Sequence, residues 1–290
     1  MISRSGEMDG RVVLVTGGTS GIGRAAATVL AAMGAEVVVT GRSRERGEKA
    51  VGEIRRESGS DRVSLIPADL AVQSEVRWLA EQFRQAHDRL DALVNNAGVI
   101  LTERTETPDG LEATFAINHL APFLLTGLLL DLLKESAPSR VITVSSEARR
   151  GAEIDFDDLQ SERRYRGFPV YGMTKLANVM FTFELAERLE GTGVTANCMH
   201  PGAVNTGFGQ NNRGPAALAF RLFKPFMRSP EQGADTFVYL AASPEVEGMT
   251  GKYVSDRKVI MASRIAYDET ARKRLWEESG RLTGLERVTA

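Results

Sequence analysis

A tyrosine and a lysine four positions apart, Tyr171 and Lys175, have side chains that could transfer a proton together. If they lie at the start of a helix, this spacing places both on one face. A lysine ammonium beside a phenol stabilises the phenolate and is expected to lower the pKa of Tyr171. A tyrosine tuned in this way suits general acid catalysis, the protonation of an alkoxide. Such pairs are also common on exposed helices, so other residues must distinguish a site from a surface.

Ser146 supplies a further polar group at the end of a predicted strand. A hydroxyl there can donate a hydrogen bond to an oxygen atom on which negative charge develops. Its neighbour Ser145 is an alternative. His119 and His200 have neither the partners of a catalytic triad nor those of a metal site, and we expect both to be structural.

A glycine-rich turn, residues 16–23, follows a run of β-branched residues and precedes a helical pattern. Gly17 permits a tight turn, Gly21 lets backbone N–H groups approach a pyrophosphate, and Gly23 lets the helix pack on the strand. The helix N-terminus then faces the anion. A plain strand-to-helix turn is the alternative. The spacing predicts a dinucleotide site that is lined by Gly17, Thr19, Ser20, Gly21, Ile22 and Gly23.

The elements that must position these residues alternate between strands and helices. Buried apolar runs predict strands at 12–16, 36–40, 63–66, 92–95, 140–145 and 195–200, and a short one at 253–254. Helical patterns occur at 21–33, 45–58, 73–86, about 110–120, 121–134 and 171–189. The alternation predicts an α/β fold with a doubly wound parallel sheet (a Rossmann fold) in three α/β/α layers.

Parallel sheets bind ligands beyond the carboxyl ends of their strands, where the motifs described here fall. No repeat, low-complexity tract or linker divides the chain. We therefore predict one domain over residues 1–290, with an irregular substrate lid at about 204–229.

Composition excludes several classes of protein. A net charge of −2 does not favour nucleic-acid binding, which needs a clustered basic excess. The first ten residues lack the apolar stretch of a signal peptide, and the most apolar run, 120–133, is too short to span a bilayer. The single cysteine, Cys198, cannot form an internal disulfide or a zinc cluster. We expect a cytoplasmic enzyme without a transmembrane segment or a metal.

The glycine turn resembles the Thr-Gly-x-x-x-Gly-x-Gly fingerprint of the short-chain dehydrogenase/reductase family, and the resemblance continues through most of the chain. Asn95-Asn96-Ala97-Gly98 is similar to the family motif after the fourth strand, and Pro201-Gly202 to the one after the sixth. The residues that match the family's catalytic tetrad are Asn118, Ser146, Tyr171 and Lys175.

The resemblance implies roles for these residues. Tyr171 would be the proton donor, with the positive charge of an oxidised nicotinamide ring adding to that of Lys175. Ser146, the second serine of its pair, would hold the substrate oxygen. Asn118 would lie near a local distortion of its helix and help to hold a water that relays protons from Lys175.

The preferred cofactor is indicated by the end of the second strand, Thr40-Gly41-Arg42-Ser43. An acidic residue there would hold the ribose 2′-hydroxyl of NAD, whereas an arginine accommodates the 2′-phosphate of NADP. Arg42 therefore favours NADP(H) over NAD(H), unless it is only a surface arginine. By resemblance, Asp69 and Leu70 contact the adenine, although Asp69 would also suit a helix N-cap. The remaining cofactor contacts would be Asn95, Ala97, Gly98, Tyr171, Lys175, Pro201, Gly202, Val204 and Thr206.

Details around the tetrad resemble the retinol-dehydrogenase-like branch of the family. These are Asn118-His119-Leu120, Tyr171-Gly172-x-Thr174-Lys175, and the extended segment 147–170. The branch implies a lipophilic carbonyl or alcohol substrate. Apolar residues in 208–228 fit such a pocket, or else pack under a helix or at a subunit interface. Helices 110–134 and 171–189 form a dimer surface in many relatives, so a homodimer is compatible with the sequence.

Two other functions fit parts of the pattern. The same fold and cofactor would serve reduction of an activated C=C bond. A non-catalytic NADP(H)-sensing protein is the third reading, and the intact tetrad argues against it.

Overall fold

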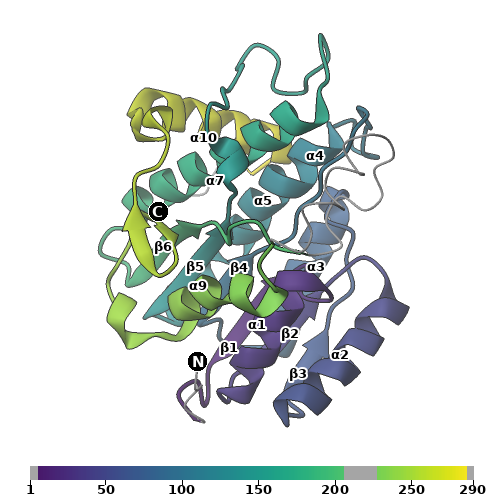
Figure 1. The fold of residues 1–290 in the computed structure, drawn as a ribbon, viewed down its shortest axis with the longest axis vertical. Helices are drawn as coiled ribbons and strands as arrows, with labels where there is room; N and C mark the ends of the chain where they lie inside the picture. The colour runs from purple at the N-terminus through teal and green to yellow at the C-terminus, as the bar shows by residue number, and fades with distance from the viewer. Residues whose placement is uncertain (1–5, 206–226, 286–290) are drawn as a thin grey trace.

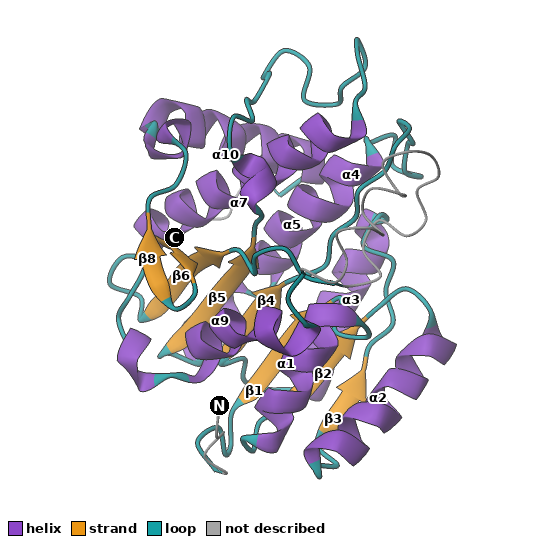
Figure 2. Ribbon diagram, viewed as in Figure 1, coloured by secondary structure: helices purple, strands orange, loops and turns teal. Residues whose placement is uncertain are grey.

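The computed structural model describes residues 6–205 and 227–285. In this part of the chain, eight strands form one sheet in the order β3-β2-β1-β4-β5-β6-β7-β8 (Figures 1 and 2). All neighbouring strands are parallel except β7 and β8. The strands are β1 (Val12–Thr16), β2 (Glu36–Thr40), β3 (Val63–Leu65), β4 (Ala92–Asn95), β5 (Ser139–Val144), β6 (Val194–Met199), β7 (Lys252–Ser255) and β8 (Lys258–Ile260).

The strand order creates a switch point between β1 and β4. From β1 the chain adds β2 and β3 on one side; it then returns to place β4, β5 and β6 on the other. Because crossovers are right-handed, this reversal sends the connecting helices to opposite faces of the sheet. The predicted doubly wound sheet is confirmed.

Two layers of helices cover the sheet (Figure 2). On one face the described helices are α1 (Gly21–Ala32), α2 (Arg44–Ser58) and α9 (Pro230–Ala242). On the other are α3 (Gln73–Ala86), α5 (Ala121–Leu128), α6 (Leu130–Glu135) and α7 (Gly167–Arg188). Successive residues of β1 alternate between the two cores: Val13 and Val15 face the first, and Val12 and Leu14 the second. Burial on both faces explains why this strand is apolar throughout.

The predicted helices at 110–120 and 121–134 are wrong as continuous helices. The chain instead forms α4 (Ala113–Phe115), a π-helix η1 (Ala116–Leu120), α5 and α6. The Glu112 carboxylate begins α4 by accepting hydrogen bonds from the N–H groups of Thr114 and Phe115 at 2.8 and 2.6 Å. A π-turn widens the helix by one residue, and such turns are frequent at functional sites. The distortion that the resemblance implied near Asn118 is therefore present.

The C-terminal helix α10 (Glu269–Thr283) was not predicted, and neither were α9 and β8. The start of α10 is capped by Asp268, whose side chain accepts a hydrogen bond from the Ala271 N–H. The end of α10 is capped by Gly284, whose backbone lies in the left-handed region. The Trp276 ring stacks on Phe181 of α7 at 5.8 Å and meets Phe123 of α5 edge-on at 5.0 Å. A homodimer stays a prediction, and an interface on α5 and α7 could not include the surfaces that α10 covers.

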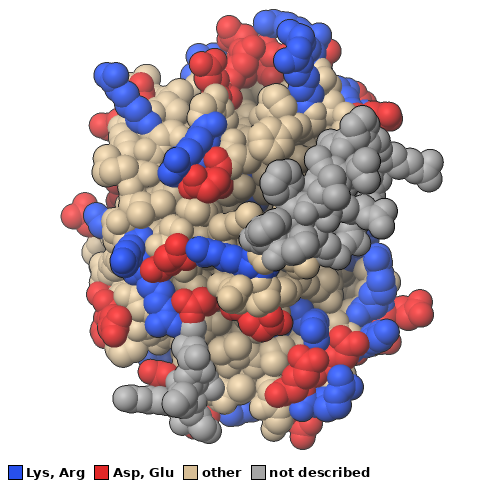
Figure 3. Space-filling view, viewed as in Figure 1, with Lys and Arg blue, Asp and Glu red and all other residues tan. Residues whose placement is uncertain are grey.

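Short 3₁₀ turns complete the described structure: η2 (Glu147–Arg149), η4 (Pro244–Val246) and η5 (Arg264–Tyr267). Among the described helices none combines the length and apolar character needed to cross a bilayer. On the face in Figure 3, basic side chains lie among acidic ones. Arg24, for example, pairs with Glu53 and Glu57, an arrangement typical of a solvated surface.

Replacing Trp276 should test how firmly α10 is held. Trp276 is 8% exposed, whereas Trp78 on α3 is 40% exposed, so Trp78→Ala is a matched control. We expect Trp276→Ala to lower the free energy of unfolding by about 3 kcal/mol, because it leaves a cavity among aromatic rings. Urea unfolding followed by circular dichroism measures this. Equal losses in the two variants would contradict the packing described.

Candidate active site

The structure brings three of the tetrad side chains together beyond the carboxyl end of β5. Ser146 is the second residue after this strand, and Tyr171 and Lys175 lie one turn apart on α7. The Lys175 Nζ lies 5.7 Å from the centre of the Tyr171 ring. The Ser146 side chain is a hydrogen-bonding partner of the Tyr171 hydroxyl. A phenol, a hydroxyl and an ammonium therefore share one side of the α7 N-terminal half.

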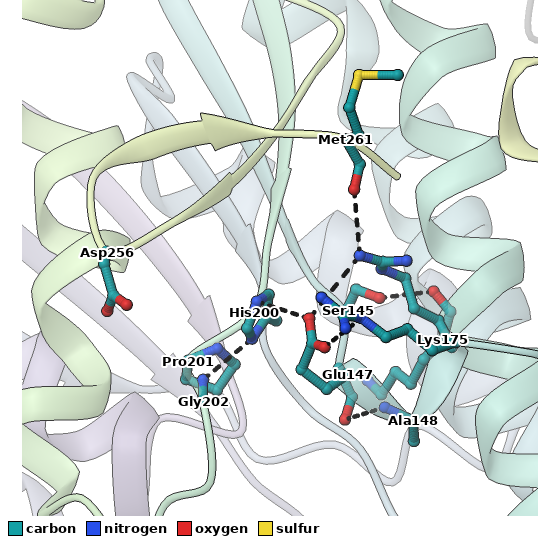
Figure 4. A network of polar contacts seen from close by, with 12 residues as sticks. Ser145, Glu147, Ala148, Lys175, His200, Pro201, Gly202, Asp256 and Met261 are labelled. Carbon is teal, nitrogen blue, oxygen red and sulfur yellow. Dashed lines mark hydrogen bonds and ion pairs between the residues drawn. The ribbon is translucent and has the colours of Figure 1, made fainter. Parts of the chain in front are cut away.

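Lys175 is buried and fixed by the backbone of β5. Its Nζ donates to the Val144 carbonyl at 3.0 Å, and burial lowers its pKa to about 8. The Ser145 hydroxyl donates to the Lys175 carbonyl at 2.7 Å (Figure 4). Ser145 thus holds α7 against the sheet, which leaves Ser146 as the serine that faces Tyr171.

The expected lowering of the Tyr171 pKa by Lys175 is not found in the described structure. Burial raises this pKa to about 12, and the hydrogen bond with Ser146 opposes the rise only in part. Withdrawing a phenolate from water costs more than the Ser146 hydrogen bond offsets, and the Lys175 ammonium is directed at the Val144 carbonyl. The Tyr171 hydroxyl consequently carries its proton at neutral pH.

Asn118 lies on η1, and its side chain is bonded on both sides. Oδ1 accepts from the Val99 N–H at 2.7 Å, and Nδ2 donates to the Val99 carbonyl and to the Thr174 hydroxyl. Thr174 in turn donates to the Tyr171 carbonyl at 2.8 Å. The amide therefore ties the segment after β4 to the turn of α7 that carries Tyr171. Its role in a water relay stays a prediction.

Gly98 belongs to the segment after β4 and lies next to the tetrad. A Cβ atom here would lie 3.3 Å from both Asn118 Oδ1 and Lys175 Nζ. This is closer than most real Cβ contacts, so a side chain would crowd both groups. Its predecessor Ala97 donates its N–H to the Thr16 hydroxyl at 3.1 Å. Both residues therefore lie between the glycine turn and the tetrad, and their contact with a cofactor stays a prediction.

The glycine turn forms a cradle that side chains would fill. Gly17 and Gly21 have positive φ values of 63° and 53°. A Cβ atom on Gly23 would lie 2.4 Å from the Gly17 carbonyl oxygen, and one on Gly18 would lie 2.6 Å from Val39 Cγ1. The sequence did not identify Gly18 as a position that requires glycine. The requirement comes from its close contact with β2 and not from the geometry of the turn itself. The open backbone fits the approach of a pyrophosphate to the N-terminus of α1.

Asn96 holds this turn from across the switch point. Its Nδ2 donates to the carbonyl oxygens of Thr16 and Gly17 at 2.8 and 3.2 Å, and its N–H donates to the Thr16 hydroxyl. Neighbouring Asn95 does not reach the site, since its side chain is buried and donates to Thr126 on α5 at 3.0 Å. Of the pair, only Asn96 has its side chain at the predicted cofactor site.

Thr19 and Arg42 come from neighbouring turns after β1 and β2. A Cβ atom on Gly41 would lie 2.7 Å from Thr19 Oγ1, so the two turns touch. Ser20 and Arg42 are exposed beside this contact. After β3, Asp69 Oδ1 accepts from the Ala71 N–H at 3.0 Å. It does not cap α3, whose N-cap is Val72. Leu70 is half-buried at the same edge of the sheet.

Val204 packs under α9 beside Ile22. A Cβ atom on Gly233 would meet Val204 Cγ2 at 2.7 Å and Ile22 Cγ1 at 3.3 Å. Val204 also forms a parallel β-bridge with Arg228, which brings together the two ends of the predicted lid. Thr206 and most of that lid, residues 206–226, lie outside the described residues.

Sequence reasoning missed the partner of His200. The His200 Nε2 lies 2.9 Å from Glu147 Oε1, and the Gly202 N–H donates to His200 Nδ1 at 3.2 Å (Figure 4). The sequence did contain a signal for this pair. Glu147 follows Ser146 and His200 precedes Pro201, and the strands before these residues, β5 and β6, are neighbours in the sheet. His119, in contrast, is buried between Asn178 and Ser279, and burial lowers its pKa to about 4.

Comparison with known proteins agrees with this geometry. A family model described as short chain dehydrogenase matches residues 11–216. Retinol dehydrogenase 14 from Homo sapiens is 44% identical over 296 residues, covering 97% of this chain and 88% of the relative. Members of the family are oxidoreductases that bind nicotinamide cofactors.

Solved structures are similar over nearly the whole fold. A putative uncharacterized protein from Mycobacterium paratuberculosis has a TM-score of 0.77 at 31% identity, covering 95% of this chain and 94% of the other. RhlG from Pseudomonas aeruginosa, in an active-site complex with NADP, has a TM-score of 0.70 at 29% identity, covering 87% and 96%. The chain therefore belongs to the short-chain dehydrogenase/reductase family, in its retinol-dehydrogenase-like branch.

Proposed function

We propose that this protein is an NADP(H)-dependent oxidoreductase that interconverts a lipophilic aldehyde or ketone and its alcohol, with Tyr171 as general acid and base. One observation carries the proposal. The hydroxyl of the half-buried Tyr171 keeps its proton at neutral pH, next to Ser146 and the Lys175 ammonium. A proton donor, a hydrogen-bond donor and a positive charge in one place are what the reduction of a carbonyl requires.

NADPH, when bound at the glycine turn, supplies the hydride. During reduction, negative charge develops on the substrate oxygen, and the Ser146 hydroxyl donates a hydrogen bond to it. Tyr171 transfers its hydroxyl proton to this oxygen, which completes the alcohol and leaves a phenolate. The nearby Lys175 ammonium stabilises that phenolate until a proton from solvent replaces the one transferred. Oxidation of the alcohol follows the same steps in reverse.

The preference for NADP(H) rests on the end of β2. Arg42 is exposed beside the Thr19–Gly41 contact, and no acidic residue occupies 40–43. A guanidinium there can make charge-assisted hydrogen bonds to a 2′-phosphate. RhlG, a structural relative, was solved with NADP, which supports the same choice.

The proposed substrate class follows from the relatives. Retinol dehydrogenase 14 is named for a lipophilic alcohol, and the predicted apolar segment 208–228 would suit such a molecule. Reduction of an activated C=C bond and NADP(H) sensing without turnover are the alternatives that experiment must separate. A cytoplasmic location stays a prediction.

Removing the Tyr171 hydroxyl tests the enzyme class. We expect the wild type to oxidise NADPH at 340 nm with a panel of lipophilic aldehydes and ketones. Tyr171→Phe should lose this activity by about 10²–10⁴-fold, the usual contribution of a general acid, while still binding NADPH. Tyr165→Phe is a matched control, because that half-buried hydroxyl bonds to Thr114 and Leu101 outside the tetrad.

Product analysis decides between the alternatives. An unsaturated aldehyde reduced at its double bond would establish the C=C reductase. Tight NADPH binding without any product would favour a sensor. Full activity in Tyr171→Phe would overturn the proposed proton donor.

Arg42→Ala tests the cofactor preference. Loss of a charge-assisted hydrogen bond to the 2′-phosphate should raise KM for NADPH by about tenfold or more, with little effect on KM for NADH. Arg46→Ala is the control, since this arginine is also exposed but lies on α2, one turn further from the site. A wild-type preference for NADH would refute the role of Arg42 and leave that of Tyr171 standing.

Gly23→Ala tests the cradle itself. The new Cβ would lie 2.4 Å from the Gly17 carbonyl oxygen, so the turn must shift. We expect the Kd for NADPH, measured by fluorescence titration, to rise by about tenfold or more, a change of at least ~1.4 kcal/mol. Gly52→Ala on α2 meets nothing within 4 Å and should leave NADPH binding intact. Wild-type affinity in Gly23→Ala would mean that the cofactor does not approach this turn.

A further inference from the structure

The turns that follow β5 and β6 are joined by two side chains outside the tetrad. Glu147 comes directly after Ser146, and His200 directly before Pro201 (Figure 4). The Glu147 carboxylate lies 2.9 Å from His200 Nε2, and the Gly202 N–H donates to His200 Nδ1 at 3.2 Å. One imidazole ring thus spans the space between the two turns.

The ring is held in place from several sides. His200 is 7% exposed and stacks on the Tyr253 ring at 5.6 Å. The buried Arg149 guanidinium lies 4.2 Å from the centre of the same tyrosine ring and 3.8 Å from Glu147 Oε1. The other carboxylate oxygen of Glu147 pairs with Arg150 Nε at 2.6 Å. We call the contact between Glu147 and His200 the bridge; neither of its two side chains is free to rotate away.

The hydrogen bonds determine which form of His200 fits. The Gly202 N–H is a donor only, so Nδ1 must accept with its lone pair. Nε2 then carries the proton and faces the Glu147 carboxylate at 2.9 Å. Only the neutral imidazole satisfies both partners. In the imidazolium form, an Nδ1–H would face the Gly202 N–H, and that bond would be lost.

Both ends of the bridge lie against groups that the proposed reaction uses. Ser146 begins the turn that contains Glu147, and its Oγ accepts from the Ala148 N–H at 3.2 Å. Gly202, in the left-handed region at φ 78°, belongs to the predicted cofactor contacts. The two turns come from neighbouring parallel strands, and the last backbone hydrogen bond before them runs from the Ser145 N–H to the Met199 carbonyl at 2.7 Å.

We propose that Glu147 and His200 are positioning residues that fix the distance between the Ser146 hydroxyl and the Pro201–Gly202 turn, and hence between substrate oxygen and cofactor. This inference rests on the proposed function. Misplacing reacting groups by about 1 Å can lower a rate by up to 10²-fold, so breaking the bridge should slow turnover without unfolding the protein.

The bridge should also depend on pH. Burial lowers the pKa of His200 below its ordinary value near 6.5, while Glu147 and Asp256 raise it and Arg149 and Arg228 lower it further. A group with a lowered pKa in the folded state is neutral at higher pH and becomes charged as pH falls through that pKa. The bridge is therefore intact at and above the ordinary histidine pKa of about 6.5, and it is lost only as pH falls through the lowered pKa of His200. The charged and titratable groups around the ring are Glu147, Arg149, Arg228, Tyr253 and Asp256.

The chain contains a matched control for this pair. His87 Nδ1 lies 3.4 Å from Glu36 Oε1 at the opposite, amino-terminal edge of the sheet. We would compare His200→Phe and Glu147→Ala with His87→Phe and Glu36→Ala in the full chain, after checking each variant by thermal unfolding. Kinetics with NADPH and a reactive aldehyde, and NADPH titrations followed by fluorescence, would be run from pH 5 to 9.

We expect His200→Phe and Glu147→Ala to lower kcat/KM by about tenfold or more at pH 8, and the two control variants to match the wild type. In the wild type kcat/KM and NADPH affinity should fall below about pH 6.5, and His200→Phe should lack the part of this fall due to His200. Glu147→Gln should move the acid limb to lower pH, because a neutral partner no longer stabilises the imidazolium.

Wild-type kinetics and an unchanged acid limb in folded His200→Phe and Glu147→Ala would overturn the proposal. Equal losses in the His87 and Glu36 variants would do the same. If the larger substitutions unfold the chain, the direction of the shift in Glu147→Gln decides. If the wild type has no turnover, the proposed function fails separately, and the pH dependence of NADPH affinity in wild type and His200→Phe still tests the bridge.

Discussion

The whole site depends on the meeting of β1 and β4 at the centre of the sheet. Here the chain reverses its direction of growth, so the turns after these strands diverge to opposite faces and leave open the edge between them. Asn96 closes that gap from one side by bonding to the carbonyls of Thr16 and Gly17. Asn118 forms a second link of this kind, because its amide bonds to Val99 after β4 and to the N-terminal half of α7. Two amides thus set where the glycine turn and Tyr171 lie relative to each other.

Burial then decides the protonation of the groups placed there. Tyr171 and Lys175 are both withdrawn from water, and the effect on each is opposite: the phenol holds its proton more strongly and the ammonium less. The two pKa values, which are close to each other for these groups in water, therefore move apart to about 12 for Tyr171 and about 8 for Lys175. Because a proton passes to the group with the higher pKa, a Tyr171 phenolate takes up a proton from the region of Lys175 more readily than a phenolate would take one from a lysine in water.

Patterns in the sequence correctly predicted the features that depend on residues close together in the chain. The bounds of β1, β2, β4 and α3 follow from apolar periodicity and agree with the structure, and the tetrad was predicted from the resemblance to the family's motifs. Reasoning failed where a distant partner decides the outcome. The Tyr171 pKa depends on burial by several segments, the side chain of Asn95 faces Thr126, and His200 has its carboxylate on the turn after a neighbouring strand. Helix α10 was missed for the same reason, since it and the π-turn at 116–120 stabilise each other, whereas the distortion near Asn118 was expected from the family resemblance alone.

Because of this mutual support, helix α10 influences the geometry of the site. His119, next to Asn118 on the π-turn, contacts Ser279 of α10 through Nε2 and Asn178 of α7 through Nδ1. Asn178 lies one turn beyond Lys175 and donates, like it, to the Val144 carbonyl. The Asn118 turn, the lysine and the C-terminal helix are therefore linked through buried polar contacts, which are costly to leave unpaired. A helix whose sequence shows no catalytic motif thus helps to hold the widened turn on which Asn118 is placed.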